Sequence, residues 1–189
     1  MPITTLDRAT ALVVIDIQKG VARIPTAHPS AGVIDNCVRL VDAFRAKSKP
    51  VVLVRAGFAA DSGDALKART QTPFPAGKRD ADFFEYVDAL RADPARDILI
   101  HKRQWGAFYG TDLDLQLRRR GITNIVLCGI ATGYGVESTA RDAWEHGYNL
   151  TFATDAMTDM NLDVHDRALQ FVFPRIGELG TTDEVAAKL

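Results

Sequence analysis

The stretch NIVLCGIATGYGVESTARDA, residues 124–143, decides the fold prediction. Its opening run NIVLC is mostly apolar, which is typical of a strand buried on both faces of a sheet. A turn marked by glycines follows, and residues 136–146 then have the pattern of a helix that ends before Gly147. This order of strand, tight turn and helix is typical of a β–α–β unit. The turn holds Gly133, Tyr134 and Gly135 but no nucleophile, although such a corner is well placed to carry one.

The same alternation runs along the whole chain. The apolar runs that we expect to form strands occupy residues 11–17, 50–56, 97–102, 124–129 and 149–156, with a sixth short strand in residues 177–185. The helical patterns run from Ser30 to Pro50, from Thr111 to Gly121, over residues 136–146, and from about Asp163 to Pro174. This alternation predicts a three-layer α/β fold, in which helices cover both faces of a six-stranded, mostly parallel sheet.

The composition is that of an ordinary globular protein. The 189 residues predict one domain spanning residues 1–189, with 47% hydrophobic and 25% charged residues. The net charge of −1 provides no electrostatic basis for binding nucleic acid or an anionic membrane. No apolar stretch reaches the ~18 residues of a membrane span, and the N-terminus has no signal-peptide pattern. Cys37 and Cys128 fall inside a predicted helix and strand, so we expect buried thiols and a cytoplasmic location.

Residues 57–96 break the regular alternation. They are polar and rich in Gly, Pro and Arg, and only residues 83–91 have a helical pattern. A connection of this length inside a compact domain usually has a function, so we expect a lid or part of a binding wall. Five residues are candidates for binding a substrate anion, with a solvated surface position as the alternative for each: Arg55, Arg69, Gln71, Lys78 and Arg79.

Ligands of open parallel sheets bind beyond the carboxyl ends of the strands. Several polar or aromatic residues follow the predicted strands at this edge: Asp16, Gln18, Arg55, His101, Lys102, Arg103, Trp105, Phe108, Thr132 and Asp155. We expect the binding site to lie among these side chains. Trp105, Phe108 and Phe74 either line an apolar pocket wall or pack in the core.

Asp16 and Lys102 are the candidate reactive pair. A carboxylate inside the apolar run VVIDIQ is costly, so Asp16 is either a general acid or base, or a cap for nearby backbone N–H groups. Lys102 ends a strand rather than lying on a helix face, and a solvated surface lysine is its alternative. Burial raises the pKa of a carboxyl and a nearby lysine lowers it, and the sequence leaves open which effect wins.

The glycine corner has two interpretations. GYGVES resembles a degenerate dinucleotide-binding motif, with Asp155 about twenty residues further on, but Ser138 replaces the third glycine. We favour an anion or oxyanion pocket formed by the N–H groups at the start of the helix from Val136. No metal-binding motif is present, and Cys128 lies within a strand, so we expect it in the core rather than as a nucleophile.

Four segments resemble the isochorismatase-like, or cysteine hydrolase, superfamily: ALVVIDIQ, KRQWGAF, GIATGYGVESTARDAWEHGY and ATDAMTD. The resemblance implies a six-stranded parallel sheet, a homo-oligomer (dimer or tetramer) and a cis peptide bond at Ile130–Ala131. It also implies a reactive Asp, Lys and Cys, which Asp16 and Lys102 match, whereas Gly135 stands in the place of the cysteine. We expect substrate contacts from Gln18, Trp105, Phe108, Ile130, Ala131, Thr132 and Tyr134.

The missing thiol shapes the activity that the resemblance implies. Amidases of the superfamily use a covalent thioester step, which glycine cannot supply. Isochorismatases are similar to this chain in having glycine at the corner, and they cleave an enol ether by protonating its vinyl carbon. We therefore expect a hydrolase in which Asp16 is the acid, while Lys102 and the corner N–H groups hold a substrate carboxylate.

No cofactor or metal is expected for this chemistry. Isochorismatases carry a histidine where Gly133 stands, so the substrate itself stays open. Two alternatives remain at this point. One is hydrolysis of another small amide or ureide by water that Asp16 activates, and the other is a non-catalytic binding protein on the same fold.

Overall fold

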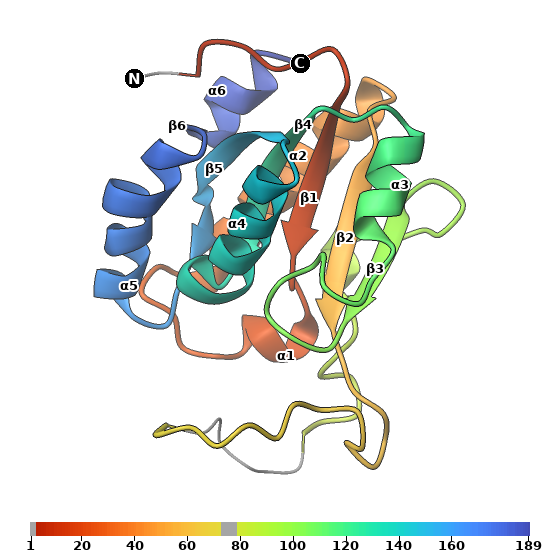
Figure 1. The fold of residues 1–189 in the computed structure, drawn as a ribbon, viewed down its shortest axis with the longest axis vertical. Helices are drawn as coiled ribbons and strands as arrows, with labels where there is room; N and C mark the ends of the chain where they lie inside the picture. Colours follow the sequence, from red (N-terminus) through yellow and green to blue (C-terminus); the bar gives the residue numbers. More distant parts are fainter. Residues whose placement is uncertain (1–2, 73–78) are drawn as a thin grey trace.

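The computed structural model describes residues 3–72 and 79–189 and shows the predicted three-layer α/β fold (Figure 1). One parallel sheet has the strand order β3-β2-β1-β4-β5-β6. The strands are β1 (Thr10–Ile15), β2 (Val51–Ala56), β3 (Ile98–Lys102), β4 (Asn124–Ile130), β5 (Asn149–Thr158) and β6 (Glu178–Gly180). The chain order reverses between β1 and β4, and such a reversal is where open α/β sheets bind ligands.

Continuous apolar runs place β1 and β4 at the centre of the sheet. Every residue of both strands is buried, as expected for parallel strands that are covered on both faces. Their register sets Val14 beside Cys128 and Ile15 beside Gly129. The two strands therefore end together, and the residues that follow them, Asp16 and the glycine corner, meet at the carboxyl edge of the sheet.

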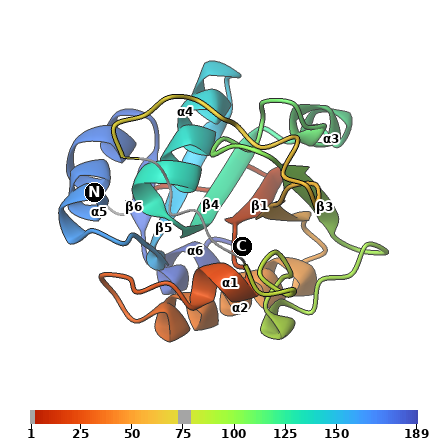
Figure 2. The same cartoon turned by 90° about the horizontal axis from the view of Figure 1, so that it is seen from below.

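Helices cover both faces of the sheet (Figures 1 and 2). The first face carries α2 (Ser30–Ala46) and α6 (Thr182–Ala186). The second face carries α3 (Leu113–Arg119), α4 (Glu137–Glu145), and α5 (Leu162–Arg167) with the π-helical turn Ala168–Val172 and the 3-10 turn Phe173–Arg175 that continue it. A short helix, α1 (Lys19–Ala22), follows β1. Over the described ranges, the helices lack the length and hydropathy that a membrane span requires.

The structure corrects two of the predicted elements. The helix predicted for residues 83–91 is wrong, since only Asp88–Leu90 forms a 3-10 turn. Residues 81–84 form turns instead, and Tyr86 makes an isolated antiparallel bridge with Gln18. In addition, β5 continues beyond the predicted end at residue 156 as far as Thr158, after a shift in its register against β4. Because of this longer strand, the carboxylate that follows β5 is Asp159 and not Asp155.

Residues 57–72, the first part of the connection over residues 57–96, lie on the carboxyl side of the sheet, below the strand arrowheads in Figure 1. Edge-to-face ring contacts join Phe84 to both Phe58 and Phe83. The predicted lid or binding wall stays a prediction. Phe74, a candidate for an apolar pocket wall, and Lys78, a candidate for anion binding, lie outside the described residues.

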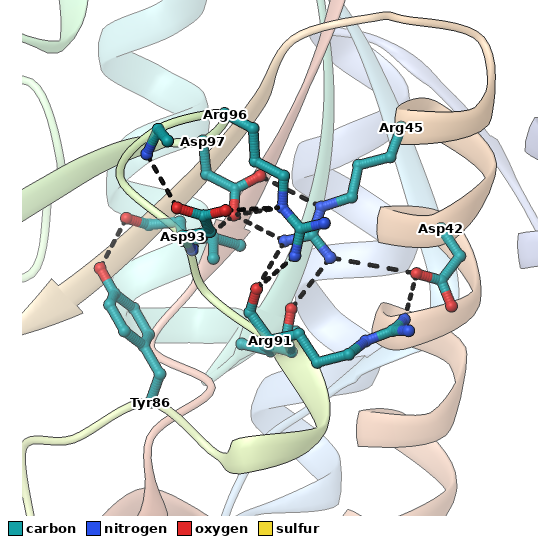
Figure 3. A network of polar contacts seen from close by, with 10 residues as sticks. Asp42, Arg45, Tyr86, Arg91, Asp93, Arg96 and Asp97 are labelled. Atoms are coloured by element: carbon teal, nitrogen blue, oxygen red, sulfur yellow. Dashed lines mark hydrogen bonds and ion pairs between the residues drawn. The ribbon is translucent and has the colours of Figure 1, made fainter.

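A buried ion pair fixes the returning part of this connection to α2 (Figure 3). The Arg45 guanidinium donates to both carboxylate oxygens of Asp97, at 3.1 and 2.6 Å, and to the Leu90 carbonyl at 3.0 Å. The Asp97 side chain is only 1% exposed. On the same segment, the Tyr86 hydroxyl donates to the Leu53 carbonyl of β2 at 2.8 Å. The chain that runs beside Gln18 is therefore anchored to both α2 and β2.

Candidate active site

Asp16 lies directly beyond β1, at the point where the chain leaves the sheet. Its φ of 51° is in the left-handed region, which a non-glycine residue rarely adopts. Its N–H still donates to the Val54 carbonyl at 3.0 Å, while its own carbonyl accepts from the Gln18 N–H at 2.8 Å. The turn thus begins at Asp16 and directs its side chain away from the path of the strand.

Lys102, the last residue of β3, is the partner of Asp16. Its side chain is fully buried, and its Nζ lies 2.8 Å from Asp16 Oδ2. The same Nζ donates to the Trp105 carbonyl at 2.5 Å. Because β2 lies between β1 and β3, the pair joins two strands that are not neighbours. The surface alternative for Lys102 is therefore wrong.

The structure also resolves the competition that the sequence left open at Asp16. Burial raises the pKa of its carboxyl, and this effect exceeds the opposing effects of Lys102 and, to a smaller extent, of the Ala56 N–H. The second oxygen, Oδ1, is buried and has no hydrogen-bond partner among the described residues. A carboxyl with a raised pKa and an uncommitted oxygen is able to hold a proton and to donate it.

Gly135 faces this pair from the glycine corner. A Cβ atom on Gly135 would lie 3.1 Å from Lys102 Nζ and 3.2 Å from Asp16 Oδ2. The peptide bond Ile130–Ala131 that precedes the corner is cis, which confirms the expectation drawn from the resemblance. The three positions predicted to carry the chemistry, far apart in the sequence, thus come together at the switch between β1 and β4.

The corner is braced by a polar cluster that the sequence analysis missed. Thr132 Oγ1 lies 2.8 Å from His165 Nδ1, and the Gly133 N–H donates to Asp159 Oδ2 at 2.8 Å. Asp159 and His165 are both buried. The sequence signal for Asp159 is its place directly after the last residue of β5, Thr158, just as Asp16 directly follows β1. It was missed because the strand was expected to end at residue 156.

Asp155 is not part of this site. Its Oδ1 accepts from the N–H and the hydroxyl of Thr182 at the start of α6, at 2.7 and 2.8 Å. It was placed at the carboxyl edge because β5 was expected to end at residue 156. The ribose-binding role that the dinucleotide interpretation required of Asp155 therefore has no support.

The backbone of the corner also differs from the expected anion pocket. The Gly133 N–H is taken by Asp159, and the Tyr134 and Val136 N–H groups donate to the Ala131 carbonyl at 3.2 and 3.1 Å. These three amides are satisfied within the protein because the corner is wound as a π-helical turn, Thr132–Val136. The expectation that they hold a substrate carboxylate is corrected.

Two of the predicted substrate contacts have other roles. The Gln18 side chain is buried, and its amide bonds to both backbone groups of Ala56. Phe108 belongs to the core, where its ring contacts those of His146 and Tyr148. Sequence periodicity cannot distinguish a buried residue of this kind from one that lines a pocket, because residues of either kind can follow the end of a strand.

The other predicted contacts stay close to the corner. Trp105, half-exposed, packs edge-to-face on Tyr134 with ring centroids 5.0 Å apart. Three further predicted contacts are buried at the start of the corner: Ile130, Ala131 and Thr132. Their roles in binding a substrate stay predictions.

The two thiols lie away from the reactive pair. Cys37 and Cys128 are buried, with their sulfur atoms 3.8 Å apart. The hydrogen bond to Cys37 and burial both raise the pKa of the Cys128 thiol, so it is not suited to be a nucleophile. This confirms Cys128 as a core residue.

Among the described residues named for anion binding, Arg55 and Arg79 contact aromatic rings. The Arg55 guanidinium lies 6.0 Å from the ring centre of Tyr86, and that of Arg79 lies over the rings of Phe83 and Phe84. Arg69 and Gln71 are exposed. Within residues 3–72 and 79–189, no cluster of three His, Cys, Asp or Glu side chains is arranged to hold a metal ion.

Comparison with known proteins adds the family. The Isochorismatase domain matches residues 10–184, which is most of the chain. The chain belongs to the isochorismatase family. A relative within the family is YecD of Escherichia coli O157:H7, an uncharacterized isochorismatase family protein, which is 47% identical over 181 residues. That alignment covers 94% of this chain and 95% of YecD.

Two further relatives extend the comparison within the isochorismatase family. The ureidoacrylate amidohydrolase RutB of Rhizobium rhizogenes is 32% identical over 192 residues, covering 88% of this chain and 77% of RutB. The solved structure of an isochorismatase family protein from Burkholderia thailandensis has 42% identity and a TM-score of 0.94, covering 99% of this chain and 98% of that chain. The family and its amidohydrolase relatives identify the protein as a hydrolase, so the non-catalytic alternative is set aside.

Proposed function

We propose that this isochorismatase-family hydrolase cleaves a small carboxylate-bearing substrate through the acid–base chemistry of Asp16, without a covalent thiol intermediate. We further propose an enol ether of the isochorismate type as the bond that is cleaved. The observation that carries the proposal is Asp16 Oδ1, which is buried and unpartnered on a carboxyl whose pKa is raised. This is the state that a proton donor requires.

The reaction needs a proton on carbon and then water. Protonated Asp16 gives its proton to the vinyl CH₂ carbon of R–O–C(=CH₂)–COO⁻, which leaves an oxocarbenium ion at the ether carbon. Water adds to that carbon, and the Asp16 carboxylate takes back a proton. The hemiketal then collapses to the alcohol R–OH and pyruvate, so water is the only reactant consumed besides the substrate.

Lys102 supports both the acid and the substrate in this scheme. An ammonium group has three N–H donors, and Asp16 and Trp105 accept from two of them. We assign the third donor to the substrate carboxylate. The positive charge of Lys102 also stabilises Asp16 after the proton has left.

Gly135 is, in this proposal, the position at which amidases of the family carry their cysteine. The direction of its Cβ toward Asp16 and Lys102 supports that assignment. Without a side chain there, the Gly135 backbone packs closely against the pair, since even a Cβ would lie only 2.9 Å from Ile15 Cγ2. The site residues and the absence of a covalent step are proposals that stand on this geometry.

The direct test is to incubate the protein with isochorismate and to measure pyruvate by a coupled lactate dehydrogenase assay. We expect pyruvate release, and we expect Asp16→Asn to lower kcat by about 10²-fold or more, because the amide cannot donate the proton. Absence of pyruvate with the unaltered protein, or an unaffected Asp16→Asn variant, would reject the proposal.

A second candidate is hydrolysis of a small ureide or amide by water that Asp16 activates as a base. The similarity to a protein named as a ureidoacrylate amidohydrolase favours it. The pH profile separates the two candidates. An acid role requires protonated Asp16, so kcat falls as the pH rises through the raised pKa of Asp16. A base role requires the carboxylate, so kcat rises over the same interval.

We also propose that the protein works in the cytoplasm as a homodimer or homotetramer. The two free, buried thiols support a reducing location. The oligomeric state rests on similarity to the family alone. Light scattering coupled to size-exclusion chromatography measures it, and a monomer at micromolar concentration would contradict it.

A further inference from the structure

Gln18 makes an unusual pair of hydrogen bonds for a side chain. It is completely buried two residues after Asp16. Its Nε2 donates to the Ala56 carbonyl at 2.9 Å, and its Oε1 accepts from the Ala56 N–H at 2.9 Å. Both backbone groups of the last residue of β2 are thus satisfied by one side-chain amide.

The register of β1 and β2 explains why Ala56 needs such a partner. Along this edge the Leu12 N–H donates to the Pro50 carbonyl and the Asp16 N–H to the Val54 carbonyl. Two residues further, the same register would bring the backbone of residue 18 to Ala56. The Gln18 N–H is instead used within the turn, where it donates to the Asp16 carbonyl at 2.8 Å. The Gln18 side chain therefore completes the ladder in place of the backbone.

The opposite side of the turn is also held. The Lys19 N–H donates to the Glu85 carbonyl at 2.8 Å, and the Val87 N–H donates to the Ile17 carbonyl at 3.2 Å. These backbone bonds fix the residues after the turn but do not reach Asp16 itself. Two links join the turn to β2: the Asp16 N–H bond to the Val54 carbonyl, and the Gln18 amide, which reaches Ala56 at the end of the strand.

We propose that Gln18 is a positioning residue, whose amide ties the left-handed turn at Asp16 to the end of β2 and so keeps the carboxyl against Lys102 and Gly135. The residue acts through Asp16 and does not contact the substrate. A neutral amide suits the position because it supplies a donor and an acceptor at once. The inference rests on the proposed role of Asp16, but its test needs no substrate.

The experiment is a ¹³C NMR titration of the Asp16 carboxyl, assigned with the Asp16→Asn variant. Gln18→Met keeps the approximate shape of the side chain and removes both hydrogen bonds. We expect the Asp16 pKa to fall toward the ordinary value of about 3.9, because a loosened turn admits water to the carboxyl. We also expect faster hydrogen exchange at the Ala56 N–H. Gln18→Asn, whose amide is one methylene shorter, should act in the same direction and serves if the methionine variant does not fold.

The matched control is Tyr86→Phe. It removes a hydrogen bond to the Leu53 carbonyl of the same strand and leaves the turn and its two bonds to Ala56 in place. We expect a lower melting temperature with an unchanged Asp16 pKa. An unchanged Asp16 pKa in the Gln18 variants, whatever their stability, would overturn the positioning role. Failure to release pyruvate from isochorismate would reject the proposed reaction and leave the titration result standing.

Discussion

At the scale of the residue, the proposed chemistry depends on the absence of a side chain at Gly135. A Cβ there would lie 2.9 Å from Ile15 Cγ2 as well as close to Asp16 and Lys102, so the neighbours would have to move by a few tenths of an ångström. Any side chain at this position would therefore crowd Asp16 and Lys102. The glycine is compatible with an acid mechanism and incompatible with a thioester mechanism.

Two substitutions at Gly135 separate these effects. We expect Gly135→Ala to lower kcat/KM for the proposed reaction by about tenfold or more, because a methyl group displaces substrate from the reacting geometry. We expect the thiol introduced by Gly135→Cys to be alkylated by iodoacetamide while Cys37 and Cys128, which are buried, stay unmodified. Steady-state kinetics and mass spectrometry measure the two results. An alanine variant with full activity would show that the space at Gly135 is not used.

At the scale of the element, the turn between β4 and α4 is shaped by a contact from α5. His165 supports Thr132, and its ring packs edge-to-face on that of His28 with centroids 4.8 Å apart. Burial lowers the pKa of His165, and the neighbouring His28 lowers it further, while Asp159 and Asp166 oppose the change. The folded protein therefore favours the neutral imidazole.

This contact predicts a loss of stability in mild acid. The unfolded chain binds a proton at His165 with a pKa near 6.5, and the folded chain does so only at lower pH. Between these two values the unfolded state holds more protons, so the free energy of unfolding falls as the pH drops below about 6.5. We expect urea denaturation to give a lower free energy of unfolding at pH 5.0 than at pH 7.5. His165→Gln should reduce the difference between the two pH values, and an equal difference in that variant would contradict the assignment.

At the scale of the whole molecule, the ion pair of Figure 3 joins α2 to the start of β3 and to the returning part of the 57–96 connection. The same returning segment pairs with residues 17–20 just after Asp16. A contact distant from the active site thus helps to hold the chain that surrounds it. The Arg45–Asp97 ion pair therefore contributes both to the stability of the molecule and to the order of the candidate site.

Removing one partner of this pair should be costly. We expect Asp97→Asn to lower the free energy of unfolding by about 3–5 kcal/mol, because it leaves the Arg45 charge buried without its carboxylate. The matched control is Asp42→Asn at the exposed end of the same network, where Asp42 pairs with Arg91 and lies 3.9 Å from Arg45 Nη1. There we expect less than about 1 kcal/mol. Equal losses in the two variants, measured by urea denaturation, would contradict the central role of the Arg45–Asp97 pair.

Local signals were enough to predict the fold and two members of the site. The apolar runs identified the parallel strands, since a strand buried on both faces must be apolar throughout. Asp16 and Lys102 were found because each is a charged residue at the end of such a run. Gln18 was also noticed, but its role was predicted incorrectly, because its partner Ala56 lies 38 residues away.

The sequence by itself determined the alternation of strands and helices, the edge of the sheet where Asp16, Lys102 and Gly135 meet, and the absence of a thiol there. Only the tertiary structure decided which other groups contact these three residues and the glycine corner. The raised pKa of Asp16, its unpartnered Oδ1 and the bracing of the corner by Asp159 and His165 depend on burial and on contacts between distant segments. Hydrophobic periodicity reports which face of an element is buried, but not which polar groups meet when the elements pack.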